Sequence, residues 1–268
     1  MKRNKKVIAI ISPKGGVGKT VTIANLAVAL ATEFGKKVLA VDTNITSASL
    51  GLHLNILYPH VTIYDIIRKN FPISKTISTY NEKLDVIPAS ISIEKRDRNF
   101  EKLEENIKKV TDHYDLLLKD LVEDYDIILL DSAPGFSVES IATLKIAGGV
   151  LIVTTPDYPS VVSTTKSILY AQRMKVPTGG IILTKVTKEK YELTSEDIEK
   201  SLKLKIIKEI PFDKKIPESI ANKIPVVLFD PYCDASIAYK EIAASLIGKK
   251  YSLNFSEKIR RFLRRIGL

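Results

Sequence analysis

A glycine-rich loop near the start of the chain constrains the fold more than any other stretch. Val7–Ile11, just before it, is continuously apolar and rich in β-branched residues, which is typical of a strand covered on both faces. The loop PKGGVGKT (residues 13–20) follows, and apolar side chains then recur at helical spacing from Ile23 to Leu30. A strand, a glycine-rich loop and a helix in this order predict a phosphate-binding turn at the end of a buried parallel strand.

The residues of this loop have the chemistry that a nucleoside triphosphate needs. Glycines let successive backbone N–H groups converge on an anion, and the helix N-terminus adds partial positive charge. Lys19 can reach the β- and γ-phosphates, and Thr20 can ligate Mg²⁺. The flanking strand and helix disfavour the alternative, a glycine-rich turn that binds nothing. The nucleotide contacts that we predict are Lys14, Gly15, Gly16, Val17, Gly18, Lys19, Thr20 and Val21.

The loop departs from the strict phosphate-loop pattern, because Pro13 stands at the position of its first glycine and a second lysine, Lys14, follows. PKGGVGKT resembles the deviant Walker A motif of the MinD/ParA family of ATPases. The resemblance implies ATP and Mg²⁺ as cofactors. It also implies an ATP-bound homodimer in which Lys14 of each subunit reaches the nucleotide of the other.

Two further predicted strands end in carboxylates. Asp42 follows Lys37–Val41, and Asp131 closes the apolar run within Tyr125–Ser132. In doubly wound sheets, ligands bind at the carboxyl ends of the strands. Asp131 is therefore predicted to hold a Mg²⁺-bound water opposite the phosphate loop, where Thr20 can ligate the metal. The resemblance to the same family implies that Asp42 orders the water shell of Mg²⁺.

The segments that contain these carboxylates resemble the switches of the same family. VDTNITSASLGLHL (41–54) resembles switch I, and LLDSAPG (129–135) resembles Walker B and switch II, where Gly135 can offer its N–H to the γ-phosphate. Asn44 stands where the family usually has a second aspartate that positions the attacking water. An amide cannot accept a proton, so we expect slow hydrolysis with nucleotide binding retained. Two alternatives stay open: another residue takes the role, or the side chain at this position merely orients water. The predicted catalytic set is Lys14, Lys19, Asp42, Asn44 and Asp131.

Apolar strands alternate with helical patterns along the chain. Its 268 residues are 45% hydrophobic, which is enough for a full core. The alternation predicts an α/β fold with a doubly wound, mostly parallel sheet and helices on both faces; the resemblance implies the P-loop NTPase fold of SIMIBI type. We expect an ATPase domain at residues 1–250 and a basic amphipathic helix at 251–268. Further strands are predicted at 84–87, 149–155, 179–186 and 204–210, and helices at 61–69, at 101–123, after Pro159 and at 236–246.

The resemblance also implies where an adenine would bind. In the family, the loop after a strand like LTKV and the segment that begins PFD hold the base, which gives Thr184, Lys185, Pro211 and Asp213 here. Asp157 matches an interface position near the partner's nucleotide. An ordinary loop residue is a nearly equal interpretation of each.

Cysteine and histidine usage narrows the class of protein. The single cysteine, Cys233, excludes a disulfide framework or a two-cysteine metal or cluster motif within one chain. His53, His60 and His113 show no ligand spacing and are interpreted as surface or packing residues. No apolar run is long enough to span a bilayer and no signal peptide is visible, so we expect a cytoplasmic protein.

The net charge of +10 lies at the two ends of the chain. Residues 2–6 hold four cations, and residues 249–268 hold seven against one acidic residue, so the segment between them sums to zero. A basic surface spread over the fold, as a general nucleic-acid binder needs, is not required. DNA is therefore not expected as a partner.

The last fourteen residues, FSEKIRRFLRRIGL, predict an amphipathic helix that begins at a cap formed by Asn254 and Glu257. It is too short and too charged to span a bilayer, and its composition is typical of a helix lying in the interface of an anionic membrane. A helix docked on the domain and a basic helix on nucleic acid are the alternatives. The predicted membrane contacts are the apolar Phe255, Ile259, Phe262, Leu263 and Ile266 and the cationic Arg260, Arg261, Arg264 and Arg265.

This tail resembles the C-terminal membrane-targeting helix of the MinD branch. The resulting hypothesis is an ATP-dependent dimerising membrane switch, peripheral on the inner face of the cell membrane, that positions a cellular machine with a protein partner or activator still to be identified. A DNA-partitioning ATPase and an ATP-binding scaffold with little hydrolysis remain as alternatives.

Overall fold

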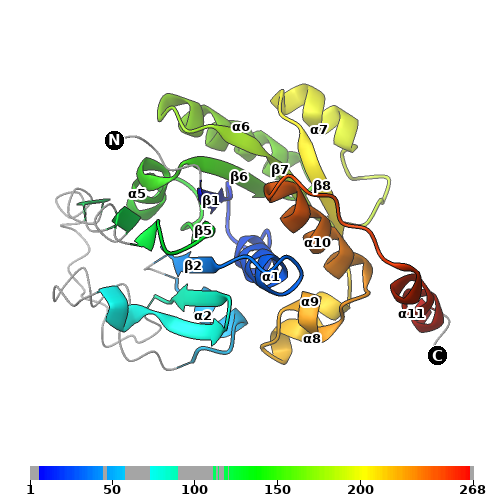
Figure 1. The fold of residues 1–268 in the computed structure, drawn as a ribbon. Coiled ribbons are helices and arrows are strands. Elements are labelled where there is room, and N and C mark those ends of the chain that lie inside the picture. The colour runs from blue at the N-terminus through cyan, green and yellow to red at the C-terminus, as the bar shows by residue number, and fades with distance from the viewer. Residues whose placement is uncertain are drawn as a thin grey trace.

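One mostly parallel sheet forms the centre of the molecule (Figure 1). The computed structural model describes residues 6–44, 47–57, 73–89, 111–112, 114, 118–119 and 121–265. In this part of the chain the strand order is β3-β4-β2-β5-β1-β6-β7-β8. The β3–β4 pair is antiparallel and all other pairs are parallel. The strands are β1 (Val7–Ile11), β2 (Val38–Asp42), β3 (Ser78–Asn81), β4 (Leu84–Ile87), β5 (Ile127–Asp131), β6 (Gly149–Thr154), β7 (Thr178–Val186) and β8 (Ile206–Pro211).

Helices cover both faces of this sheet, as the alternation of strands and helices predicts. One face carries α1 (Lys19–Thr32), α2 (Leu50–His53), α8 (Lys215–Ala221), α9 (Val226–Phe229) and α10 (Asp234–Leu246), and the other carries α5 (Val138–Ile146), α6 (Tyr158–Arg173) and α7 (Ser195–Leu202). The central strand β1 supplies both cores: Ala9 and Ile11 pack on the α5–α6 side and Ile10 packs on the α1 side. This two-sided burial explains why β1 is apolar at every position.

The position of β1 brings the predicted carboxylates to the glycine loop. β5 lies next to β1 with Asp131 beside Ile10, and β2 lies next to β5 with Asp42 beside Asp131. The three strands are parallel, so their carboxyl ends meet at one edge of the sheet. The first helix, α1, starts from that edge and is buried along most of its length between the sheet and α10.

The predicted strands are confirmed within two residues at their ends, and the predicted fold class is confirmed. The sequence does not predict the antiparallel edge strand β3 or the helices α5, α7, α8 and α9, because segments of four to nine residues are too short to show a clear periodicity. The predicted helix at 61–69 lies outside the described residues, as do most of 101–123. Of the latter segment, Tyr114, Leu118 and Leu121 are described as helical and buried in the α5–α6 core. No helix in the described ranges is long and apolar enough to cross a membrane.

A substitution at Gly180 in β7 tests how closely β7 packs against the edge strand β8. Its φ of 143° disfavours any other residue, and a Cβ there would lie 2.6 Å from Ile207 Cγ1 and 2.9 Å from the backbone oxygen of Lys205. We expect Gly180→Ala to lower the free energy of unfolding by about 2–4 kcal/mol, since backbone strain adds to overpacking.

The matched control is Gly35→Ala, because Gly35 has a φ of 63° but no atom within 4 Å of an added Cβ. Only the backbone strain of about 1–2 kcal/mol is expected there. Urea unfolding of both variants measures the difference. Equal destabilisation of the two would contradict the tight β7–β8 contact.

Candidate functional site

The glycine loop joins β1 to α1 in a conformation that only glycine adopts readily. Gly16 and Gly18 have φ values of 79° and 89°, where a Cβ would be strained. A Cβ on Gly15 or Gly16 would have no atom within 4 Å. The loop backbone therefore faces open space that a ligand can approach closely.

A cavity of about 540 Å³ lies along this loop. Its polar end is lined by Asn44, Ser49 and His53, and its apolar end by Ile210, Ile216 and Ile220, with Lys19 and Thr20 between them. This distribution fits an amphipathic ligand with an anionic end and a flat apolar end.

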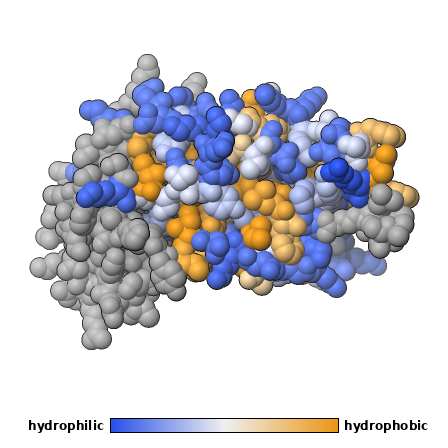
Figure 2. All heavy atoms as spheres, turned by 60° about the horizontal axis from the view of Figure 1, so that its bottom comes forward, coloured by the Kyte–Doolittle hydropathy of each residue, from blue (hydrophilic) through white to orange (hydrophobic). Residues whose placement is uncertain are grey.

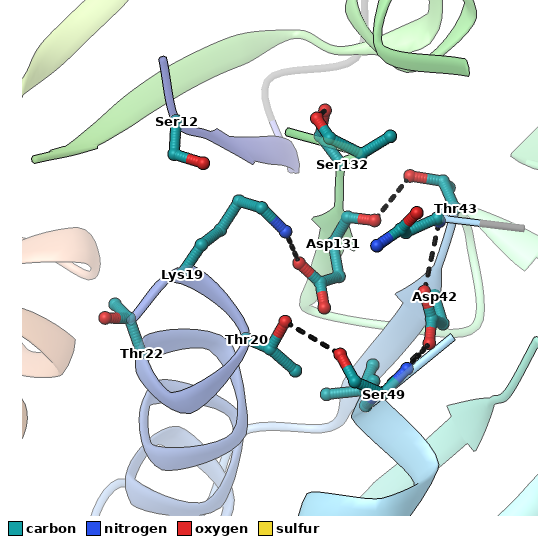
Figure 3. A network of polar contacts seen from close by, with 12 residues as sticks. Ser12, Lys19, Thr20, Thr22, Asp42, Thr43, Ser49, Asp131 and Ser132 are labelled. Carbon is teal, nitrogen blue, oxygen red and sulfur yellow. Dashed lines mark hydrogen bonds and ion pairs between the residues drawn. The ribbon is translucent and has the colours of Figure 1, made fainter. Parts of the chain in front are cut away.

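Lys19 and Asp131 form a buried ion pair behind the loop (Figure 3). The lysine Nζ contacts Asp131 Oδ1, and both side chains are almost inaccessible to solvent. The second carboxylate oxygen, Oδ2, is also buried and has no hydrogen-bond partner within the described part of the chain. An orphaned carboxylate oxygen beside Thr20 and the phosphate loop fits a divalent cation or its bound water.

Asp42 organises the backbone of the switch I segment. Its Oδ1 accepts the N–H of Asn44 at 3.0 Å, and its Oδ2 accepts the N–H groups of Ser49 and Leu50 at 3.0 and 3.1 Å. Burial, together with the nearby charge of Asp131, raises the pKa of Asp42 to about 7, although the three N–H bonds act in the opposite direction. The carboxylate thus holds the turn that presents Ser49 to Thr20, whose hydroxyl oxygens lie 3.2 Å apart (Figure 3).

Asn44 is engaged within the same turn. Its Nδ2 donates to the backbone oxygen of Ser47 at 2.9 Å, and its Oδ1 accepts the Ser47 N–H at 3.2 Å. Asn44 lines the cavity, but both ends of its amide serve the loop. In this conformation the side chain closes switch I instead of presenting a free acceptor to water.

Lys14 lies at the surface and contacts its own chain. Its Nζ is 3.4 Å from Asp157 Oδ1, and both side chains are about half exposed. Partial burial raises the pKa of Asp157, but hydrogen bonds from Ser160 and Thr155 and the charge of Lys14 outweigh this and hold it at about 2. Asp157 also caps α6 by accepting the Ser160 N–H at 2.9 Å. The Lys14–Asp157 contact is therefore exposed enough to exchange for another anion.

The residues predicted for adenine separate into two groups. Thr184 and Lys185 line the cavity; Thr184 Oγ1 donates to Val17 O at 2.6 Å, and Lys185 Nζ donates to Gly16 O at 2.7 Å. Pro211 and Asp213 are not among the lining residues. Asp213 instead accepts backbone N–H groups at the starts of α8 and α10. The apolar surface comes from the neighbouring isoleucines, whose place in the site no sequence motif indicates.

Two other assignments differ from the sequence expectation. His53 was interpreted as a surface or packing residue, yet it lines the polar end of the cavity, four residues after Ser49 on α2. Burial lowers the pKa of His53, although the charge of Asp131 acts against this. Gly135 donates its N–H to Ser12 O at 3.0 Å and does not line the cavity, whereas Pro134 does.

The predicted membrane contacts lie on α11 (Phe255–Arg265), a separate helix at the edge of the molecule (Figure 1). The predicted cap is confirmed: Asn254 Oδ1 accepts the Glu257 N–H at 2.9 Å, and Glu257 accepts the Asn254 N–H at 2.8 Å. The side chains of Leu263, Arg264 and Arg265, and all of Ile266, lie outside the described part of the structure.

Comparison with known proteins places this geometry among nucleotide-binding proteins. A family model described as "AAA domain" matches residues 5–176. An uncharacterized ATP-binding protein of Methanocaldococcus jannaschii is 36% identical, with 96% of this chain and 93% of that protein covered. The septum site-determining protein MinD of Helicobacter pylori is 30% identical, with 91% of each chain covered. Among solved structures, the MinD protein of Pyrococcus horikoshii complexed with Mg-ADP superposes with a TM-score of 0.80 at 27% identity, covering 92% of this chain and 96% of that one.

The buried pair predicts a large effect of removing its cation. Lys19→Met leaves Asp131 beside Asp42 with no compensating charge, so we expect a loss of about 3–5 kcal/mol in the free energy of unfolding without nucleotide. The double variant Lys19→Met/Asp131→Asn is expected to recover most of this loss. Denaturant titrations of the three proteins provide the measurement, and a Lys19→Met variant as stable as the wild type would refute the charge argument.

Proposed function

The chain belongs to the MinD/ParA family of ATPases, and on this premise we propose that it is a nucleotide-controlled membrane switch. It binds MgATP, pairs with a second copy of itself and associates with the inner face of an anionic membrane, where it positions a cellular machine through a protein partner. The observation that carries this proposal is the orphaned oxygen of Asp131, whose ion-pair partner Lys19 lines a cavity between its polar and its apolar residues.

The cavity supports ATP as the ligand. The loop N–H groups and Lys19 face the place of the phosphates, and Lys19 exchanges Asp131 for phosphate oxygens when they arrive. Thr20 and the freed Asp131 would hold Mg²⁺, with Asp42 behind them through the switch I turn. The metal would neutralise charge on the phosphates. Ile216 and Ile220 cover the flat face of the base, beside Lys185.

Dimerisation is supported by the position of Lys14. A second lysine in a phosphate loop would normally point to its own ligand, but this one lies outside the cavity lining and half exposed against Asp157. ATP in a second copy offers stronger anions than one carboxylate. We propose that Lys14 leaves Asp157 for the phosphates of the partner, so that the dimer forms only around nucleotide.

Membrane association is supported by the composition and exposure of α11. The side chains of Phe255 and Phe262 are exposed, and the segment carries a strong excess of cations. One short amphipathic helix binds a bilayer marginally, whereas a second on the same dimer engages at high effective concentration and raises avidity about a hundredfold or more. Dimerisation driven by ATP therefore promotes membrane binding. Hydrolysis of the ATP separates the dimer and releases it from the membrane.

A second candidate function is favoured by Asn44. Its amide is bonded at both ends within switch I and cannot accept a proton from water. A scaffold that binds ATP and dimerises but scarcely hydrolyses it is consistent with this arrangement. The two candidates share the site and differ only in turnover.

Co-sedimentation with liposomes tests the membrane switch. We expect the wild type to sediment with phosphatidylglycerol vesicles in the presence of ATP and Mg²⁺, and about a hundredfold more weakly with ADP, because only the dimer engages two tails. Deletion of residues 255–268 is expected to abolish binding in both states.

Neutral phosphatidylcholine vesicles are the control for charge. Equal binding with ATP and ADP, or binding unchanged by the deletion, contradicts the switch. Salt-sensitive binding to duplex DNA with no binding to vesicles would favour a DNA-partitioning function instead.

The rate of ATP turnover separates the two candidates. Asn44→Asp restores a proton acceptor at the cavity, so we expect an increase in kcat of at least about tenfold with a smaller change in ATP affinity. Asn44→Ala is the matched control, since it removes the bonds to Ser47 without adding a base. An Asp variant no faster than the wild type would mean that position 44 does not limit hydrolysis.

A further inference from the structure

Among its described side chains, α11 leaves much of its apolar side exposed. Phe255, Ile259 and Phe262 lie on one helical stripe, and their exposed fractions are 79%, 43% and 63%. Figure 2 shows hydrophobic surface at the end of the molecule where α11 lies. A terminal helix that packed against the domain for stability would bury this stripe. The described part of the stripe stays largely accessible instead, although Phe262 also lines a cavity with Ile237 and Leu253.

The cationic side of α11 makes the contacts with the domain. Arg261 forms an ion pair with Asp234, the first residue of α10. Arg260 Nη1 donates to the hydroxyl oxygen of Tyr232 at 3.3 Å. At about 100° per residue, both arginines project more than about 100° away from the Phe255 direction. We call Asp234 and Tyr232 the bracket.

The connection between α10 and α11 is also fixed to the domain. The Tyr251 ring packs edge-on against Phe34 with ring centroids 6.3 Å apart. Lys240 lies 5.6 Å from the centroid of the Tyr251 ring, is nearly fully buried and forms an ion pair with Glu33 at 2.6 Å. The helix is therefore held both by its linker and by the bracket, and it does not hang from a free tether.

We propose that the bracket orients α11 for an anionic bilayer, and this rests on the proposed membrane function. An interfacial helix needs its apolar stripe in the acyl region and its cations at headgroup level. Contacts on the side opposite the stripe place the domain on the aqueous side of the helix, so binding requires no release. The cationic excess of residues 249–268 complements anionic headgroups, which favours a lipid surface over an apolar protein groove as the occupant.

Fixing the orientation matters most for the ATP-bound dimer. Two rigidly held helices can meet one plane together, whereas two mobile helices lose effective concentration. Removing the bracket therefore weakens the binding of the second helix of the dimer to the membrane. The lipid affinity of each single helix stays unchanged.

The Asp234→Asn variant distinguishes the loss of the bracket from a general change in the charge of the protein. Loss of a negative charge should by itself strengthen binding to anionic vesicles, yet we expect ATP-dependent binding to phosphatidylglycerol vesicles to weaken about three- to tenfold. Glu196→Gln is the matched control, because it removes one negative charge on α7 from an exposed pair with Lys200. Tyr232→Phe removes only the hydrogen bond, without a change of charge, and is expected to weaken binding less.

The motion of a spin label on α11 measures, without any membrane, whether the bracket holds the helix. Burial raises the pKa of the Cys233 thiol to about 11, so a label added at pH 7 reacts mainly with a cysteine introduced by Ser256→Cys. We expect restricted label motion in the full chain and faster motion when Asp234→Asn is added.

Stronger vesicle binding by Asp234→Asn, equal to that of Glu196→Gln, overturns the proposal, as does label motion that is the same with and without Asp234. If the wild type binds no vesicles in any nucleotide state while label motion still depends on Asp234, the proposed membrane function fails and the bilayer is the wrong occupant. Thermal melting of each variant confirms that the domain is folded.

Discussion

The ion pair between Lys19 and Asp131 is the constraint on which the site depends. Two carboxylates at the ends of adjacent parallel strands, Asp42 and Asp131, are buried behind the phosphate loop, where an uncompensated charge is costly. Without ligand, the lysine of the loop provides the compensation. A phosphate ligand with a divalent cation offers new partners of opposite charge to the lysine and to the carboxylates. Ligand binding therefore exchanges one set of buried charge pairs for another and leaves no buried charge unpaired.

The same carboxylates connect the nucleotide site to the rest of the chain. Asp42 holds switch I through backbone N–H groups, and that turn contacts Thr20 through Ser49. Near the apolar end of the cavity, although not in its lining, Asp213 accepts the Ala235 N–H at the start of α10. Asp234, the residue before Ala235, forms an ion pair with Arg261 of the tail. Short contacts thus connect the switch I turn to Thr20, and the start of α10 to both Asp213 and the tail.

The sequence predicts site residues that belong to a short local motif. It does not predict those that tertiary packing brings to the site. Val7–Ile11, Lys19 and Asp131 were identified because an apolar strand followed by glycines or a carboxylate has few other interpretations. The position of His53 in the cavity lining and the apolar end formed by Ile216 and Ile220 depend on packing between distant segments, and so does the contact of Asp213 with Ala235. The sequence also does not predict which side of α11 faces the domain. Its periodicity defines an apolar stripe but not the side that contacts the domain.

In the proposed switch, nucleotide in the cavity assembles two copies of the chain through Lys14. Light scattering after gel filtration measures the mass of the assembly. We expect a monomer with ADP and a mass twice as large with ATP and Mg²⁺. For Lys14→Ala we expect a monomer in both states, although the variant still binds nucleotide. A mass that does not depend on the nucleotide, or an ATP-bound dimer that persists in Lys14→Ala, would contradict it.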